Sequence, residues 1–150
     1  MSSKAQARGF TLIELLVVLT LIAIATAMVS LSLRDTAQSQ LETEGERLSA
    51  LFEQARAEAR GAGLPVRWRL LQDDGQGRQF VFEGLPPGLK LPQRWRTEGV
   101  RAEIVNAPAV TLGPEPLIGA QHVVLSLGSN RLDLVSDGLG PFTAEATPAP

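Results

Sequence analysis

An apolar run at residues 10–33 constrains this chain most, because it contains one carboxylate, Glu14, and no other charge. As an α-helix, these 24 residues would be about 36 Å long at 1.5 Å per residue, more than the roughly 30 Å of a bilayer hydrocarbon core. An unpaired carboxylate at the centre of a bilayer costs roughly 2.5 to 3.5 kcal/mol and usually marks function. The sequence therefore predicts a single membrane-spanning helix whose Glu14 needs a cationic partner.

A short polar segment, residues 1–9, precedes this run and carries Lys4 and Arg8. An ordinary signal peptide has its apolar core before the cleavage site and loses it, whereas here the apolar run follows the junction between Gly9 and Phe10. The two basic residues would remain in the cytoplasm, which sends the C-terminal bulk of the chain across the membrane. We therefore expect a cleaved leader and a retained membrane anchor.

The junction resembles the class III leader junction of type IV pilins and of type II secretion pseudopilins, and it reads Arg8-Gly9-Phe10-Thr11-Leu12-Ile13-Glu14. The resemblance implies that a prepilin peptidase cuts between Gly9 and Phe10 and methylates the new N-terminus at Phe10. It also implies that Glu14 meets the N-terminal amine of a neighbouring subunit as helices stack into a filament. The alternative is an uncleaved signal anchor whose Glu14 snorkels towards the cytoplasmic face.

Length and charge limit what the rest of the chain can be. Removal of nine residues from 150 leaves 141, enough for one soluble domain beyond a long helix. The formal charge changes from −2 to −4, because Lys4 and Arg8 leave with the leader, and this balance argues against general nucleic-acid affinity. The sequence has no cysteine, so neither a disulfide nor a thiolate metal site is available. We expect no cofactor and no metal.

An amphipathic helix is predicted at residues 34–62, continuous with the apolar run. Gly61, Gly63 and Pro65 are expected to end it, and Gly45 is a weak point that costs about 1 kcal/mol relative to alanine. The apolar positions at helical spacing are Leu48, Leu51, Phe52, Ala55 and Ala59. We expect this face to pack on a sheet of the same domain.

Beyond the helix the apolar period changes to two, and turn sequences separate short apolar stretches, which predicts antiparallel strands. The predicted strands are residues 66–70, 79–83, 100–105, 110–112, 123–127, 131–135 and 142–146. The fold class is therefore α+β and pilin-like, with a long N-terminal helix packed on an antiparallel β-rich domain at residues 63–146. Residues 147–150 form a flexible tail.

The triplet Arg-Trp-Arg occurs twice, at residues 67–69 and 94–96. In a strand, alternation would place both arginines of each triplet on the face opposite the tryptophan. Such patches could bind phosphate or carboxylate, as a DNA-binding pilin of a competence system would require. We favour a structural interpretation, with tryptophans packed inward and arginines in solvent, because the mature chain is acidic. The candidate contact residues are Arg67, Arg69, Arg94 and Arg96.

The sequence contains only weak candidates for a catalytic or metal site. A triad of Ser126, His122 and Asp133 would have to form from neighbouring strands without a nucleophile-elbow turn. We interpret His122 as an ordinary loop or strand-edge residue. The cluster Asp73-Asp74-Gly75 lacks the spaced carboxylates of a calcium loop and is predicted to be a hairpin turn. We expect no catalytic residue.

Two later segments narrow the resemblance. Residues 48–60, followed by Gly63-Leu64-Pro65-Val66, are similar to the helix-to-first-strand passage of H-type minor pseudopilins and of their pilus counterparts of the FimT and FimU kind. Residues 136–142 are similar to the last hairpin of that group.

This resemblance implies a minor subunit of a type II secretion pseudopilus, anchored in the bacterial inner membrane with its C-terminal domain in the periplasm. Its implied partners are the prepilin peptidase, other minor and major pseudopilins and the inner-membrane assembly platform, and its task is protein transport. The alternative is a minor type IV pilin that serves pilus assembly or DNA uptake.

Overall fold

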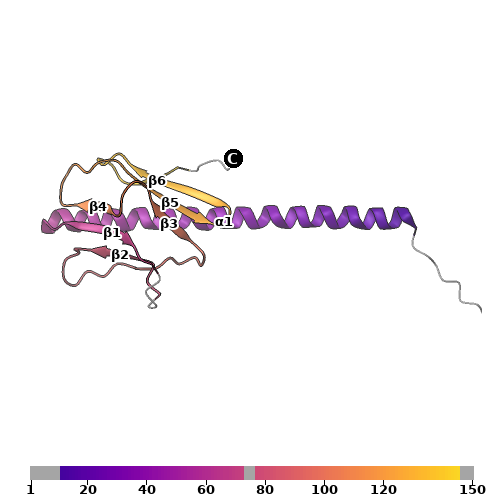
Figure 1. The fold of residues 1–150 in the computed structure, drawn as a ribbon, viewed down its shortest axis with the longest axis horizontal. Helices are drawn as coiled ribbons and strands as arrows, with labels where there is room; N and C mark the ends of the chain where they lie inside the picture. Colours follow the sequence, from indigo (N-terminus) through magenta and orange to yellow (C-terminus); the bar gives the residue numbers. More distant parts are fainter. Residues whose placement is uncertain (1–10, 73–76, 146–150) are drawn as a thin grey trace, which may run out of the picture. The chain divides into compact units, whose positions relative to one another are not determined.

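A computed structural model of the chain describes residues 11–72 and 77–145, with the backbone alone over 28–35. Contacts divide the chain into two units, between Asp35 and Thr36 within the single helix, and each unit is described by itself. The elements in chain order (Figure 1) are α1 Leu12–Ala62, β1 Val66–Leu70, β2 Phe80–Glu83, β3 Arg101–Ile104, β4 Val110–Gly113, β5 Gln121–Leu127, β6 Asn130–Ser136 and β7 Thr143–Glu145. The predicted α+β class and the predicted strands agree with these elements, except that Ala146 lies outside the described residues.

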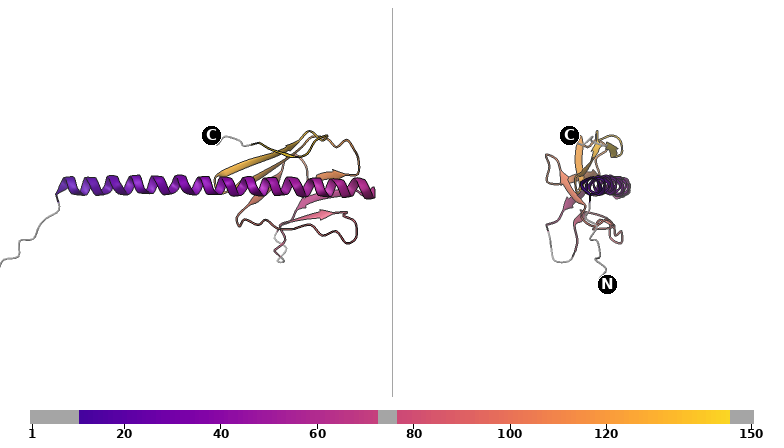
Figure 2. Two further views of the ribbon diagram at one scale, coloured as in Figure 1. Left: turned by 180° about the vertical axis from the view of Figure 1, so that it is seen from behind. Right: turned by 90° about the vertical axis from the view of Figure 1, so that its right-hand side faces the viewer.

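The second part of α1, residues 36–62, presents one buried stripe to the strands. Its fully buried apolar members are Leu41, Leu48, Phe52, Ala55 and Ala59. The strands lie alongside this part of the helix in the left view of Figure 2. The helical spacing of the stripe is what an amphipathic helix requires to cover a sheet, so the predicted packing face is confirmed.

The helix ends at Ala62 by a glycine cap. Gly63 has φ 65°, and Leu64 N donates to Ala59 O at 3.1 Å, which is the six-to-one bond of a Schellman motif. Gly61 was expected to contribute to the stop, but it lies inside the last turn of α1. A glycine in the left-handed region is what ends the helix, because the helical backbone of Gly61 needs no such freedom.

Two antiparallel sheets form the rest of the second unit. The first has the order β2-β1-β4 and the second the order β3-β5-β6-β7. The predicted hairpin is confirmed by the register of β1 with β2, in which Arg67 lies opposite Glu83. β3 and β4 are consecutive in sequence but belong to different sheets, since β3 pairs with β5 and β4 pairs with β1.

An aromatic cluster joins the helix to the first sheet. The ring centroids of Phe52 and Trp68 are 5.1 Å apart, those of Trp68 and Phe80 are 5.7 Å apart, and those of Phe80 and Trp95 are 4.7 Å apart. These separations are within the range in which aromatic pairs attract. Trp95 belongs to no strand, so a loop residue completes this part of the core.

Gly45 allows α1 to approach β6 closely. A Cβ atom at this position would overlap Cδ2 of Leu132 and would lie 3.5 Å from Cδ2 of Leu134. The loss of helix propensity predicted at Gly45 is thus accompanied by dense packing against the sheet, which a larger residue would disturb.

Candidate functional site

The predicted processing junction lies at the start of the chain, and Gly9 and Phe10 are outside the described residues. The first described residue, Thr11, caps α1. Its Oγ1 accepts from Glu14 N at 3.3 Å, and its carbonyl oxygen accepts from Leu15 N at 3.2 Å. The helix therefore begins directly after the junction, with its first turn closed by a side chain.

Glu14 lies in the first turn of α1, three residues after the cap. The order Thr11-Leu12-Ile13-Glu14 is the Thr-x-x-Glu pattern of a capping box, a signal that the sequence analysis missed. A carboxylate here also interacts favourably with the positive end of the helix dipole. Glu14 is exposed, and its carboxylate has no ion-pair partner among the residues the structure describes. The helix start explains why an acid is tolerated here, but leaves the carboxylate free for a group outside the chain.

The first unit exposes apolar side chains along α1, among which Leu12 is 83% and Leu21 is 61% exposed. Two of its hydroxyl groups are satisfied within the helix, because Thr20 donates to Leu16 O and Thr26 donates to Ile22 O, both at 2.8 Å. No polar side chain therefore interrupts the apolar surface at these two positions. Within the described residues, no helix is long and apolar enough to cross a membrane.

A buried carboxylate in the second part of α1 anchors the loop at residues 94–97. Glu44 is 2% exposed, and its Oε1 accepts from Arg96 N and from Thr97 N, both at 2.7 Å. Arg47 neutralises the carboxylate at 3.1 Å and donates to Arg94 O at 3.4 Å. We call these contacts the Glu44 clamp. These contacts could not be predicted from the sequence, since Glu44 occupies an ordinary charged position of an amphipathic helix.

A buried arginine anchors a second loop. Arg56 Nη1 donates to Gly140 O at 2.7 Å and Nη2 donates to Gly138 O at 3.2 Å, while Glu53 neutralises the guanidinium at 3.2 Å. Asp137 folds the same loop, because its Oδ1 accepts from Gly140 N at 2.8 Å and Leu139 N at 2.9 Å. The Gly140 bond first and the Leu139 bond second lower the pKa of Asp137 below its ordinary value. We call the Arg56 contacts the Arg56 clamp.

The two Arg-Trp-Arg triplets differ in structure. In the first, Trp68 is buried in β1 and Arg67 and Arg69 are exposed, as predicted. Arg69 forms an exposed ion pair with Glu83 at 2.9 Å.

The second triplet is not in a strand, because residues 94–96 form the loop of the Glu44 clamp. The loop still places Trp95 inside and Arg94 and Arg96 outside. A basic cavity of about 580 Å³ is lined by Arg94 but by none of the other three arginines.

His122 lies inside β5, where it is paired with β6 and where its carbonyl oxygen accepts from Val105 N at 3.0 Å. The prediction of a loop or strand-edge residue is therefore wrong. Its Nε2 lies 2.6 Å from Asp133 Oδ1. Ser126 follows four residues later along the same strand, roughly 13 Å away at 3.3 Å per residue, so the three side chains do not form a triad. Among the described residues, no cluster of three potential metal ligands exists.

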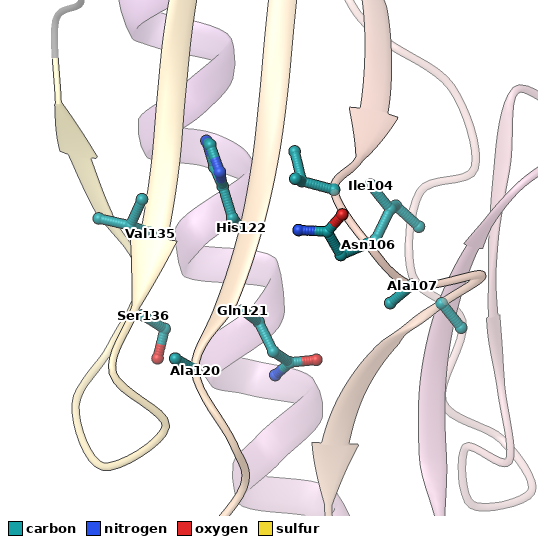
Figure 3. Close-up of a pocket in the computed structure, with 10 residues that line it drawn as sticks. Ile104, Asn106, Ala107, Ala120, Gln121, His122, Val135 and Ser136 are labelled. Carbon is teal, nitrogen blue, oxygen red and sulfur yellow. The ribbon is translucent and has the colours of Figure 1, made fainter.

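A cavity of about 320 Å³ lies beside His122 (Figure 3). Gln121 lines it and links the two sheets, because its side chain accepts from Thr111 N at 2.6 Å and donates to Thr111 O at 2.9 Å. The Gln121 amide thus makes the two backbone hydrogen bonds that a neighbouring strand would otherwise make at the edge of β4. This part-buried contact holds the domain together. Both polar atoms of the Gln121 side chain are already hydrogen-bonded in it.

Comparison with known proteins gives two findings and one negative result. Residues 4–30 match the prokaryotic N-terminal methylation motif. The type IV minor pilin FimU of Pseudomonas aeruginosa strain PAO1 is similar in structure, with a TM-score of 0.51 at 16% sequence identity, over 76% of this chain and 92% of the FimU chain. This is a pilin-like fold. No curated protein matches the sequence.

The methylation motif includes the predicted junction and indicates a membrane-anchored N-terminus. Together, the motif and the pilin-like fold mark a structural subunit, so the prediction that the chain is not an enzyme is confirmed on these two grounds. Pilin-like proteins are processed by a prepilin peptidase and assemble with other pilins. This agrees with the predicted peptidase and with filament subunits as partners in general.

Proposed function

We propose that this chain is a minor subunit of a type II secretion pseudopilus, of the H type, and that its mature form begins at Phe10. The observation that carries the proposal is the coincidence of three features at one place. The methylation motif spans the junction, α1 begins immediately after it, and Glu14 lies one turn into the helix. A pilin-like fold follows in the same chain.

The proposed mechanism begins with anchoring in the inner membrane. The apolar residues at 10–33 would lie in the bilayer before assembly and against the helices of neighbouring subunits afterwards. Contiguous exposed apolar surface of this kind requires a non-aqueous partner. The bilayer and the filament interior are the two environments that supply it.

Glu14 would then orient each incoming subunit. Cleavage at Gly9 creates a positively charged amine at Phe10 of a neighbour, and an ammonium group is the partner that a carboxylate in an apolar environment needs. Because the Thr11 cap holds the first turn, the carboxylate would be presented with little loss of conformational entropy. The periplasmic domain would dock on other pseudopilins, and filament extension would push folded proteins through an outer-membrane channel.

A minor type IV pilin is the second candidate, and the similarity of the fold to FimU favours it. The processing and the role of Glu14 would be the same in both filaments, so only the neighbouring subunits distinguish them. The basic residues give little support to DNA uptake, because Arg69 is paired and only one of the four candidate arginines lines the basic cavity.

Intact mass and N-terminal sequencing of the membrane-extracted protein test the proposal, in cells with and without a prepilin peptidase. We expect an N-methylated Phe10 start that depends on the peptidase and is lost in Gly9→Val. Gly61→Ala is the matched control, because this glycine is remote from the junction and should not affect processing. A chain that still begins at Met1 when the peptidase is present would contradict the filament function. Crosslinking to secretion or pilus subunits then selects between the two filaments.

A further inference from the structure

Three cationic side chains meet around one cavity of the second unit, which we call the basic pocket. Arg78, Lys90 and Arg94 line it, and its volume is about 580 Å³. The remaining wall is largely apolar, with Leu85 and Leu91 also packed against the core. None of the described residues that line this pocket is acidic.

The charges of the pocket are incompletely neutralised by the residues that the structure describes. Arg78 has an interaction of its own, so it carries no part of the inference. Lys90 and Arg94 have no ion-pair partner among the described residues. Like charges around a shared low-dielectric wall repel one another, and an anion between them would remove that repulsion. The pocket is therefore chemically suited to a carboxylate or a phosphate.

The position of Arg94 is fixed before any ligand arrives. Glu44 holds the backbone at residues 96 and 97, Arg47 holds Arg94 O, and Gln93 O accepts from Gln79 N at 2.8 Å. The buried Trp95 pins the loop from the core side. A preformed site loses less entropy on binding than a flexible loop. The Glu44 clamp therefore serves a docking site as well as the fold.

We propose that the basic pocket binds an acidic segment of a neighbouring filament subunit, an inference that rests on the proposed function. An arginine fork binds a carboxylate through two parallel hydrogen bonds. The leucines between the cations suit the apolar side chains of a peptide better than a sugar-phosphate backbone. The net charge of −4 after loss of the leader also disfavours a polyanion that approaches over a long distance.

Lys90 makes this proposal directly testable, because it is the only lysine after Gly9. A carbodiimide activates carboxylates, and the Lys90 amine displaces the activating group to form an amide only with a carboxylate in contact. Filaments or membranes that contain the full-length chain and its co-expressed neighbours would be treated and analysed by mass spectrometry. We expect a Lys90 peptide joined to an Asp or Glu peptide of another subunit.

Three variants test the assignment. Arg94→Glu should lower the crosslink yield by about tenfold or more, since it places a like charge opposite the acidic segment. Lys90→Arg should abolish the crosslink but retain co-purification of the neighbour, because it keeps the charge and loses the amine. Arg101→Glu is the matched control on β3, an exposed arginine that does not line the pocket, and should leave the yield unchanged.

Two results would overturn the proposal. The first is a Lys90 crosslink confined to the chain itself, or one of equal yield in Arg94→Glu. The second is electrophoretic retardation of an oligothymidylate by the wild-type protein but not by Arg94→Glu, which would make the pocket a phosphate site. In either case, a peptidase-dependent Phe10 start would still support the filament function. The proposed function and the proposed role of the basic pocket can therefore be refuted independently.

Discussion

The two parts of α1 solve the same physical problem in opposite ways. Residues 12–27 expose their large apolar side chains, whereas residues 36–62 bury theirs in full or, at Leu51, in part, as Leu12 at 83% and Leu41 at 0% exposure illustrate. The buried part also hides charge, since Glu44 is 2% and Arg56 is 5% exposed. Hydrophobicity alone therefore does not decide which residues of this helix are buried within the chain. The available partners decide it, and the described residues supply none for the apolar side chains of the first part.

The glutamates of the two parts show the same contrast. The carboxylate of Glu44 is satisfied by two backbone N–H groups and Arg47, whereas that of Glu14 has no ion-pair partner among the described residues. A buried and fully bonded carboxylate is a structural feature, and a free one at the start of an apolar helix is available for assembly. Substitutions of these two residues should consequently affect different properties.

Glu14→Ala should have the largest effect, a loss of filament incorporation by more than about tenfold, with the stability of the second unit unchanged. Glu14→Gln separates the two roles of the residue, because glutamine still completes a capping box but carries no charge. If the ammonium partner matters, Glu14→Gln should fail as Glu14→Ala does. Incorporation is measured by the ratio of sheared filament to membrane-bound protein. Normal incorporation of Glu14→Gln would reduce Glu14 to a helix cap.

Glu44→Ala should lower the free energy of unfolding by about 3 kcal/mol, because it leaves two backbone N–H groups without acceptors and Arg47 without its counter-ion. Glu83→Ala is the matched control, because Glu83 also pairs with an arginine, Arg69, but the two side chains are 45% and 49% exposed. We expect a loss below about 1 kcal/mol there. Urea unfolding followed by tryptophan fluorescence measures both. Equal losses would show that the clamp adds nothing beyond a surface ion pair.

Gly45→Ala should destabilise the chain by about 1 kcal/mol, since overpacking against Leu132 exceeds the gain in helix propensity. Gly61→Ala should stabilise it by up to about 1 kcal/mol, because no atom lies within 4 Å of the new Cβ. A double-mutant cycle of Gly45→Ala with Leu132→Val should reveal a favourable coupling. Additive effects in that cycle would remove Leu132 as the reason for the glycine.

Asp137 should give the smallest effect, confined to acid. Its pKa is lowered in the folded state, chiefly by Gly140 N–H and then by Leu139 N–H, so the native state binds fewer protons than the unfolded state. The contribution is present above the ordinary aspartate pKa of about 3.9 and disappears as the pH falls through the lower folded value. Asp137→Asn keeps an acceptor oxygen without the titration, and should flatten the acid limb of the stability curve below about pH 4. An unchanged acid limb would contradict the assignment.

Much of the fold could be predicted because its signals are local. The apolar run and the spacing of Leu48, Phe52 and Ala59 predicted one continuous helix, and a period of two predicted each strand. The cap of α1 was also predictable, because Thr11 and Glu14 form a Thr-x-x-Glu pattern. Alternation placed Trp95 inward although it lies in a loop, because alternating polar and apolar residues are also found where a loop inserts one side chain into a core.

The sequence by itself determined the long helix, the strands and the methylation motif, because each depends on residues close together in the chain. Only the tertiary structure decided that β3 and β4 join different sheets, that Glu44 holds a loop some fifty residues away, and that Arg56 holds the loop at residues 138–140. These contacts join distant segments, and each exists because a backbone donor, a counter-ion or a neighbouring strand is brought within bonding distance by the packing of the whole domain.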